Sequence, residues 1–162
     1  FIDCIDQDSI TIMLQERGLS EKEKEAFLET FQEERDQTLI AFAVLGGIFG
    51  EGIDLKGEKL SGAVIVGVGL PSICLERDLI KEHFDKHSNN GFQYAYMYPG
   101  MNKVMQAAGR VIRTDDDVGI VVLIDERFGY SYYRELFPPE WSHMKYLSNY
   151  QSIQETVKLF WR

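Results

Sequence analysis

Features that define several classes of protein are missing from this sequence. Its two cysteines, Cys4 and Cys74, lie far apart and form no C-x-x-C or other metal-ligand spacing. We therefore expect reduced thiols, as in a cytoplasmic protein, and no bound metal. No signal peptide is visible, and no apolar run approaches the roughly 20 residues that cross a bilayer. A membrane is therefore not among the expected partners.

Positive charge is also scarce. The 162 residues include 17 lysines and arginines against 26 aspartates and glutamates, which gives a net charge of −9. This balance argues against a surface that binds nucleic acid throughout, although it leaves room for a local cationic groove. Much of the acidity falls in residues 20–36, which we interpret as a solvated helix face. The length and the 44% of hydrophobic residues suit one domain with a sizeable core.

The apolar residues are organised as strands alternating with helices. Continuous apolar runs predict buried strands over residues 10–14, 38–47, 62–71 and 118–125. Helices are expected after the N-cap Ser20, with Glu23 as its capping-box partner, and over residues 72–87, 102–113 and 153–161. This order predicts an α/β fold with a parallel sheet covered on both faces, in which ligands bind at the carboxyl ends of the strands.

A glycine-rich segment follows the second expected strand. Residues 45–57, LGGIFGEGIDLKG, contain five glycines and the carboxylates of Glu51 and Asp54. The patterns GxxxxGK[ST] and GxGxxG are both absent, so this segment is not the main cradle of a triphosphate. The two carboxylates suit contacts with water, magnesium or arginine, but a plain surface turn fits them equally well.

The helix expected over residues 102–113 has two unlike sides. Its apolar stripe comprises Met101, Val104, Met105, Ala108, Val111 and Ile112. Gln106, Arg110 and Arg113 fall on the opposite side, within an arc of about 60°. They face either water or another body. Arginine stays charged and its fork matches phosphate, so we favour an anion over a merely solvated face.

Two of these segments together resemble motifs V and VI of superfamily two DNA helicases, most closely the DinG/XPD branch. Residues 46–57, GGIFGEGIDLKG, are similar to motif V. The motif VI pattern Q-x-x-G-R-x-x-R, followed by a strand and D-x-R-F, matches Gln106, Gly109, Arg110, Arg113, Asp125, Arg127 and Phe128. The resemblance runs from about residue 10 to residue 137.

The resemblance implies a second RecA-like motor domain: three layers, with a mostly parallel central sheet flanked by helices. Residues 1–162 would form this single domain as a fragment of a longer protein with a truncated start. The full-length protein would be an ATP-dependent DNA helicase, an ATP hydrolase. ATP with Mg²⁺ would lie between two motor domains and be held mainly by the first RecA-like domain of the same chain, which this sequence lacks.

The resemblance also assigns roles to residues. Arg110 and Arg113 would be catalytic, stabilising the transferred γ-phosphate, and which of them contacts it stays open. Gln106, Gly52, Asp54 and Glu51 would contribute to the ATP site. Single-stranded DNA would meet Lys56, Lys59 and Lys103. Tyr94, Tyr96 and Tyr98 alternate, so we expect a strand with one buried face and at most one of them touching DNA.

Relatives can carry an iron–sulfur cluster in their first domain, so such a cluster is possible elsewhere in the full-length protein. DNA repair is the family's usual setting. Two other interpretations remain: a catalytically inactive helicase-like scaffold and a stand-alone nucleotide-binding domain. The second predicts ATP affinity for this chain by itself, whereas the helicase interpretation predicts that the fragment alone is inactive.

Overall fold

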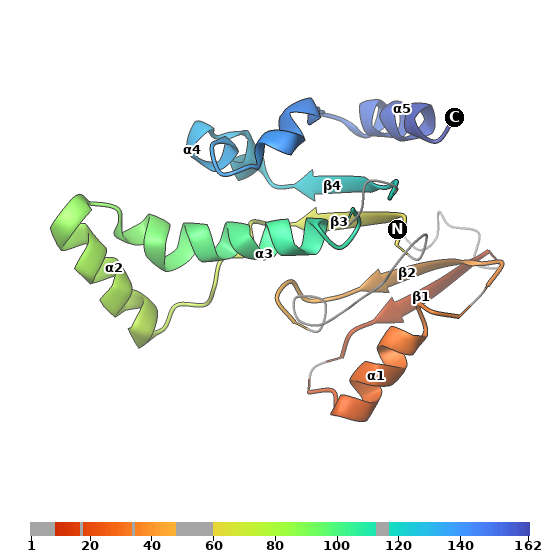
Figure 1. Cartoon of the computed structure of the whole chain (residues 1–162), viewed down its shortest axis with the longest axis horizontal. Helices are drawn as coiled ribbons and strands as arrows, with labels where there is room; N and C mark the ends of the chain where they lie inside the picture. Colours follow the sequence, from red (N-terminus) through yellow and green to blue (C-terminus); the bar gives the residue numbers. More distant parts are fainter. Residues whose placement is uncertain (1–8, 17, 34, 48–59, 113–116) are drawn as a thin grey trace. The chain divides into compact units, whose positions relative to one another are not determined.

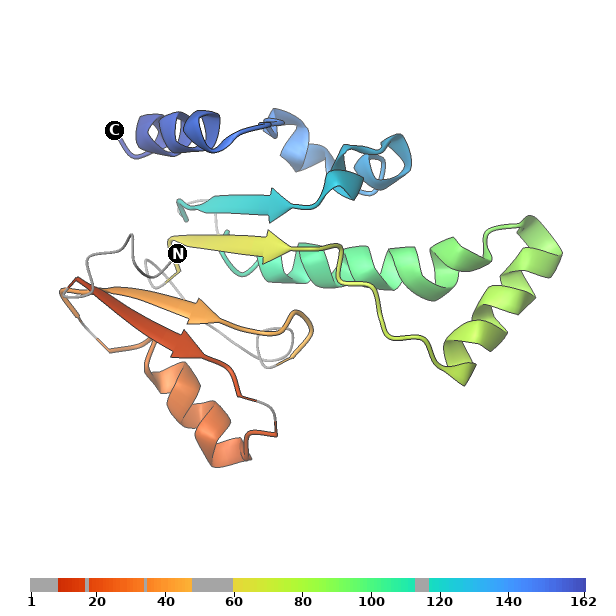
Figure 2. The same ribbon diagram turned by 180° about the vertical axis from the view of Figure 1, so that it is seen from behind.

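The computed structural model describes residues 9–16, 18–33, 35–47, 60–112 and 117–162. The chain divides into two compact units. The first comprises Phe1–Ala63 and Asn102–Gly119, and the second comprises Val64–Met101 and Ile120–Arg162. Figures 1 and 2 trace the path of the chain through its helices and strands from two sides.

The first unit is built on a parallel pair of strands joined by a helix. Strand β1 (Ile10–Leu14) pairs in parallel with β2 (Thr38–Phe42), from Ile10 opposite Thr38 to Leu14 opposite Phe42. Between them runs helix α1 (Glu21–Glu29), whose N-cap Ser20 forms the predicted capping box with Glu23. Phe27 is the buried residue of this helix.

Strands β3 (Gly62–Val66) and β4 (Ile120–Ile124) form a second two-stranded sheet. Figure 1 shows their arrows pointing the same way. Just beyond β3, the Gly67 N–H donates a hydrogen bond of 3.0 Å to the Ile124 carbonyl. The β3–β4 sheet and the β1–β2 pair are the parallel, helix-flanked elements of an α/β RecA-like fold, and that fold class is confirmed.

Helix α2 (Leu75–Ser88) ends at Asn89, which adopts a left-handed conformation with φ 57°. A π-helix, η3 (Gln93–Met97), then runs directly into α3 (Tyr98–Ala108). After β4 come four short or terminal elements: η4 (Glu126–Gly129), α4 (Ser131–Arg134), η5 (Pro139–His143) and α5 (Tyr150–Phe160). Within the described ranges, every helix is too short or too polar to cross a lipid bilayer.

Helix α3 carries much of the core. Met101, Val104 and Ala108 are each at most 2% exposed and follow the helical period. Tyr133 and Val68 are the other large, fully covered side chains of the described residues. The apolar stripe predicted for this helix is therefore confirmed over most of its length.

The prediction that the strands are buried on both faces was wrong for β2, in which no residue is fully buried and Phe42 is 48% exposed, and for β3. Strand β3 spans five residues, and Val64 and Val66 are 63% and 73% exposed. An unbroken apolar run carries no alternation, so it does not reveal which of its side chains other elements will cover. Here β3 has one neighbouring strand among the described residues, and part of its apolar surface stays exposed.

The inward face predicted for α2 was also wrong in part. Leu75, Leu79 and Ile80 are 72%, 57% and 37% exposed, and no residue of the helix is fully buried. Phe84 does pack as expected, stacked on Tyr94 with ring centroids 3.9 Å apart. The helix meets the chain chiefly through its contacts with η3, so its apolar residues outside that contact are left uncovered.

The strand expected for the alternating tyrosines does not form. Tyr94 and Tyr96 lie in η3, and Tyr98 begins α3. Rings four residues apart pair instead: Tyr94 with Tyr98 at 5.1 Å and Phe92 with Tyr96 at 5.6 Å. Residues that alternate at every second position also recur at every fourth position, and a spacing of four places side chains on one face of a helix. Here these helical ring contacts form and the strand does not.

Candidate functional site

The candidate site lies where α3 ends. Gln106 and Gly109 are exposed and Arg110 is half-buried, whereas Val111 is only 4% exposed. The polar and apolar sides therefore separate as predicted. The helix is shorter than predicted, because after Ala108 the chain continues as a turn in which the Arg110 N–H donates to the Ala107 carbonyl at 3.2 Å.

That early end explains one error in the predicted apolar stripe. Ile112 is 45% exposed rather than buried. The turn beyond Ala108 changes the rotation per residue, so the 3.6-residue period no longer carries Ile112 to the core side. Ile112 instead borders the same surface as the polar residues.

Gln106, Gly109, Arg110 and Ile112 together line one open hollow of about 530 Å³. The structure thus brings Gln106 and Arg110 to the same open surface. Gly109 adds no side chain to it, and a Cβ there would lie 3.2 Å from the Met105 carbonyl oxygen. Several N–H donors around a small-residue surface suit an oxygen-rich anion such as phosphate.

Lys103 lies beside the beginning of the glycine-rich segment. A Cβ added to Gly46, whose φ is +83°, would lie 3.1 Å from both Cδ and Cε of Lys103. The lysine stem therefore runs over this glycine, and any larger residue there would displace it. The structure places Lys103 within the first unit, against the carboxyl-end side of β2.

Gln15, which sequence reasoning missed, fixes the turn after β2. The side-chain Oε1 of Gln15 accepts a hydrogen bond of 2.9 Å from the Val44 backbone N–H. The backbone N–H of Gln15 donates to the Phe42 carbonyl at 2.8 Å. Gln15 directly follows β1 and so occupies the edge where ligands of parallel sheets bind. That position was the signal available in the sequence.

The other predicted site residues fall outside the described residues. They are Arg113, the motif V-like residues Glu51, Gly52 and Asp54, and the lysines Lys56 and Lys59. Their roles stay predictions.

Asp125 and Arg127 of the D-x-R-F sequence bind each other. Arg127 donates from Nε to Oδ1 at 2.8 Å and from Nη2 to Oδ2 at 2.7 Å, and its backbone N–H donates to Oδ1 at 2.9 Å. The side-chain bonds from Arg127 hold the pKa of Asp125 below its ordinary value. Phe128 is 4% exposed. This sequence therefore closes the end of β4 and starts η4.

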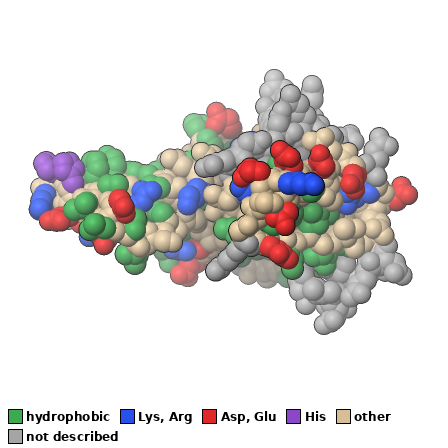
Figure 3. All heavy atoms as spheres, turned by 90° about the horizontal axis from the view of Figure 1, so that it is seen from below, with side chains coloured by type: hydrophobic (Ala, Val, Ile, Leu, Met, Phe, Trp, Pro, Cys, Tyr) green, Lys and Arg blue, Asp and Glu red, His purple; other side chains and the backbone are tan. Residues whose placement is uncertain are grey.

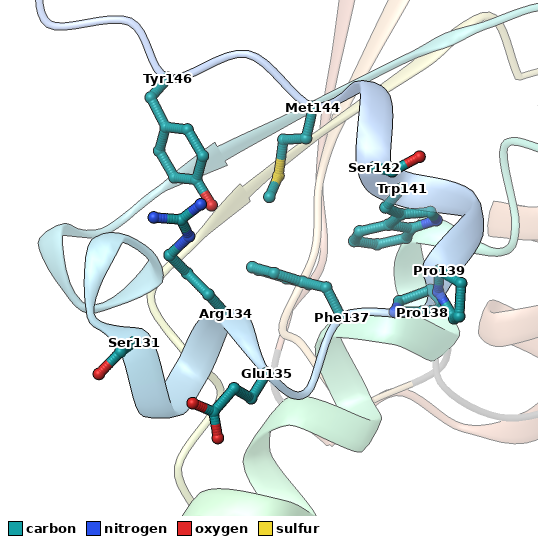
Figure 4. A pocket seen from close by; sticks show the side chains of 10 residues that line it. All are labelled: Ser131, Arg134, Glu135, Phe137, Pro138, Pro139, Trp141, Ser142, Met144 and Tyr146. Carbon is teal, nitrogen blue, oxygen red and sulfur yellow. The ribbon is translucent and has the colours of Figure 1, made fainter.

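A second hollow, of about 480 Å³, lies in the second unit (Figure 4). The Arg134 guanidinium stacks over the Tyr146 ring, 4.8 Å from its centroid. Phe137 and Trp141 stack on each other at 5.5 Å. The hollow was not predicted from the sequence, where the Pro138–Pro139 break was its only signal.

Metal-binding side chains do not cluster in threes in the part of the chain that the structure describes. It contains no group of three or more histidine, cysteine, aspartate or glutamate side chains placed to hold an ion. Cys74 is exposed and free. What the α3 hollow offers is a cation and an amide, a donor set that fits phosphate oxygens.

Comparison with known proteins places the chain. A family described as "Helicase C-terminal domain" matches residues 3–144. A probable ATP-dependent helicase of Methanocaldococcus jannaschii is 30% identical over 72% of this chain and 19% of its own length. The ATP-dependent DNA helicase DinG of Photobacterium profundum is 35% identical over 50% of this chain and 12% of its own.

A Caenorhabditis elegans homolog of regulator of telomere elongation helicase 1 is 33% identical over 70% of this chain and 12% of its own length. The chain thus spans between 12% and 19% of these three relatives. The family match covers both segments that resemble motifs V and VI. This chain belongs to the helicase C-terminal domain family and is the C-terminal domain of a DinG/XPD-type helicase.

Proposed function

We propose that this domain supplies the arginine-bearing half of an ATP site in an ATP-dependent DNA helicase. One observation carries the proposal: Gln106 and Arg110 line a single open hollow at the end of α3, apart from its buried residues Met101, Val104 and Ala108. Two of the relatives are named as ATP-dependent helicases. The other half of the site, with a phosphate-binding loop and Mg²⁺, belongs to a first motor domain.

Charge decides the chemical role of the arginines. Bound ATP with Mg²⁺ is the substrate. As the bond to ADP breaks, its electron pair goes to the leaving ADP oxygen, and the oxygens of the γ-phosphoryl group in transfer also carry negative charge. The guanidinium groups of Arg110 and Arg113 stabilise that charge, and the Gln106 amide donates to a phosphate oxygen. Arginines that act in this way increase the rate of hydrolysis by a factor of about 10³ to 10⁵.

The glycine-rich segment couples this site to DNA in the proposal. Glu51, Gly52 and Asp54 belong to this segment, which follows β2. In the proposal, their contacts with the ATP site change when ATP is hydrolysed. Lys56, Lys59 and Lys103 face single-stranded DNA. The position of the Lys103 stem against Gly46 supports this grouping, because it keeps the lysine next to the segment that carries the other residues.

The decisive experiment replaces Arg110 by alanine in the full-length helicase. We expect turnover of ATP in the presence of single-stranded DNA to fall by about 10³-fold, with nucleotide affinity largely retained, because the guanidinium acts mainly on the transition state. Phosphate release gives the turnover, and titration with a fluorescent ATP analogue gives the affinity.

Arg162→Ala is the matched control, since it removes an exposed arginine at the end of the chain. It should leave both values unchanged. Normal DNA-stimulated turnover in the Arg110→Ala and Arg113→Ala proteins would instead support a scaffold role for this domain and would overturn the proposal.

A further inference from the structure

Two of the three histidines of the chain, His83 and His87, lie four residues apart on α2. That spacing places both side chains on one face of a helix. Their ring centroids are 4.5 Å apart, with 34° between the planes, and both residues are exposed. Figure 3 shows histidine side chains gathered at one end of the visible surface.

The hydrogen bond made by His87 determines which of its nitrogens can bind a ligand. His87 Nδ1 lies 2.7 Å from the backbone carbonyl oxygen of His83. A carbonyl only accepts, so Nδ1 carries the proton and Nε2 of the neutral ring keeps its lone pair. A histidine that binds metal through one nitrogen commonly donates from the other to a backbone carbonyl in this way.

His83 is restrained by aromatic contacts. Its ring meets Phe84 edge-on, with centroids 5.3 Å apart and 89° between the planes. Phe84 is itself stacked on Tyr94. The pair of imidazoles therefore starts from a partly ordered arrangement, which lowers the entropy that a bound ion would have to remove.

The surrounding charges do not oppose a cation. Lys86 is paired with Glu82 at 2.6 Å, and Lys81 with Asp85 at 2.7 Å. His87 also lies in the last turn of α2, where the negative end of the helix dipole favours positive charge.

We propose that His83 and His87 form a two-imidazole site for one divalent transition-metal ion of the class that prefers nitrogen ligands: Zn²⁺, Ni²⁺ or Cu²⁺. Zinc–nitrogen bonds of about 2.1 Å allow two ligand nitrogens to lie at most about 4.2 Å apart, a separation within reach of rings this close. Since the described residues contribute no third side chain, water completes the coordination shell and the ion exchanges readily.

Isothermal titration of the chain with Zn²⁺, Ni²⁺ and Cu²⁺ tests the proposal. We expect one ion per chain, with affinity higher for Cu²⁺ than for Ni²⁺ or Zn²⁺. His83→Gln and His87→Gln should each weaken binding at least about tenfold, the lower limit for disturbing a metal site. Histidine ring resonances in NMR spectra should shift for these two residues only.

His143→Gln is the matched control. That histidine is also exposed and also has Nδ1 near a backbone carbonyl, 2.9 Å from the oxygen of Glu140, but it has no second histidine beside it. Binding should survive in this variant. Equal binding in all three variants, or no binding by the unaltered chain, would overturn the proposal.

Discussion

Gly100 lies where α3 passes close to the backbone that follows β3. A Cβ at this position would lie 2.5 Å from the Val68 carbonyl oxygen and 3.2 Å from the Gly69 carbonyl carbon. Backbone atoms cannot swing away as the end of a side chain can, so the helix itself would have to move. The absence of a side chain at residue 100 therefore sets how near α3 lies to this segment.

Gly100→Ala should destabilise the chain by about 1–3 kcal/mol, the usual cost of overpacking. The sign is informative, because alanine is intrinsically favoured over glycine inside a helix by about 1 kcal/mol. The free energy of unfolding from urea titration measures the effect. Gly129→Ala is the control, since a Cβ there meets nothing within 4 Å. An unchanged or raised stability for Gly100→Ala would contradict the close approach.

The Asp125–Arg127 pair should make the stability of the fold depend on pH. The pKa of Asp125 is lower in the folded chain, because Arg127 donates hydrogen bonds to its charged form. Its contribution to stability is complete above the unfolded pKa of about 3.9 and is lost as the pH falls through the lower folded value. Asp125→Asn keeps an acceptor at this position and removes the charge.

We expect Asp125→Asn to cost about 1 kcal/mol at pH 7, a modest value because the Arg127 side chain is 37% exposed and solvent screens the pair. The cost should shrink as the pH is lowered below about 4, since the unaltered carboxylate then becomes protonated as well. Urea midpoints at several pH values give the difference. Asp36→Asn removes an exposed carboxylate and should show no such trend; a cost that persists at low pH would argue against the pair.

At the scale of elements, a proline shapes the junction between η3 and α3. Pro99 has no N–H, so it cannot donate to the Ala95 carbonyl four residues earlier. Arg77 of α2 donates to that carbonyl instead, from Nη1 at 3.2 Å. A π-helical turn immediately before the proline, with the Tyr98 N–H bonded to the Gln93 carbonyl, accommodates the interruption. One side chain of α2 thus stabilises the irregular start of α3.

Arg77→Met should cost about 1 kcal/mol, because it removes a hydrogen bond to the Ala95 carbonyl in a partly buried position. In a Pro99→Ala background the cost should be smaller, since the N–H of residue 99 can then serve the same carbonyl. A double-mutant cycle on unfolding free energies measures this coupling. Lys86→Met, which removes an exposed cation from the same helix, is the control. Equal costs for Arg77→Met in both backgrounds would exclude the role given to the proline.

At the scale of the whole molecule, the chain corresponds to a small part of its relatives. It matches 12–19% of the length of three relatives. Its sequence has no GxxxxGK[ST] pattern, and the hollow at the end of α3 is open and lined by four residues. An arginine and an amide on such a surface can complete a phosphate site but cannot enclose a triphosphate alone.

We therefore expect this chain by itself to bind ATP poorly and to hydrolyse none. Phosphate release measured with and without single-stranded DNA tests this, with the full-length helicase under the same conditions as the positive control. Turnover by the isolated chain would contradict the shared-site proposal and would favour a self-sufficient nucleotide-binding domain.

The sequence by itself determined the local features and the family. The bounds of β1, the capping box at Ser20 and the buried stripe through Met101 and Val104 all followed from it. These features depend on hydrogen bonds and periods that span four residues or fewer. The identities of neighbouring residues are therefore enough to predict them. The resemblance of two segments to helicase motifs likewise pointed to the family that matches residues 3–144.

The tertiary structure decided which surfaces are covered and how closely elements approach. It left Val66 and Leu75 exposed, and it placed the Arg77 guanidinium within hydrogen-bond distance of the Ala95 carbonyl. It also brought backbone so close to residue 100 that only glycine fits there. By ending α3 at Ala108 it also left Ile112 exposed beside Gln106 and Arg110. Each of these outcomes depends on partners distant in the sequence or on where a helix stops. Burial and packing are sums over such long-range contacts, which a local pattern does not contain.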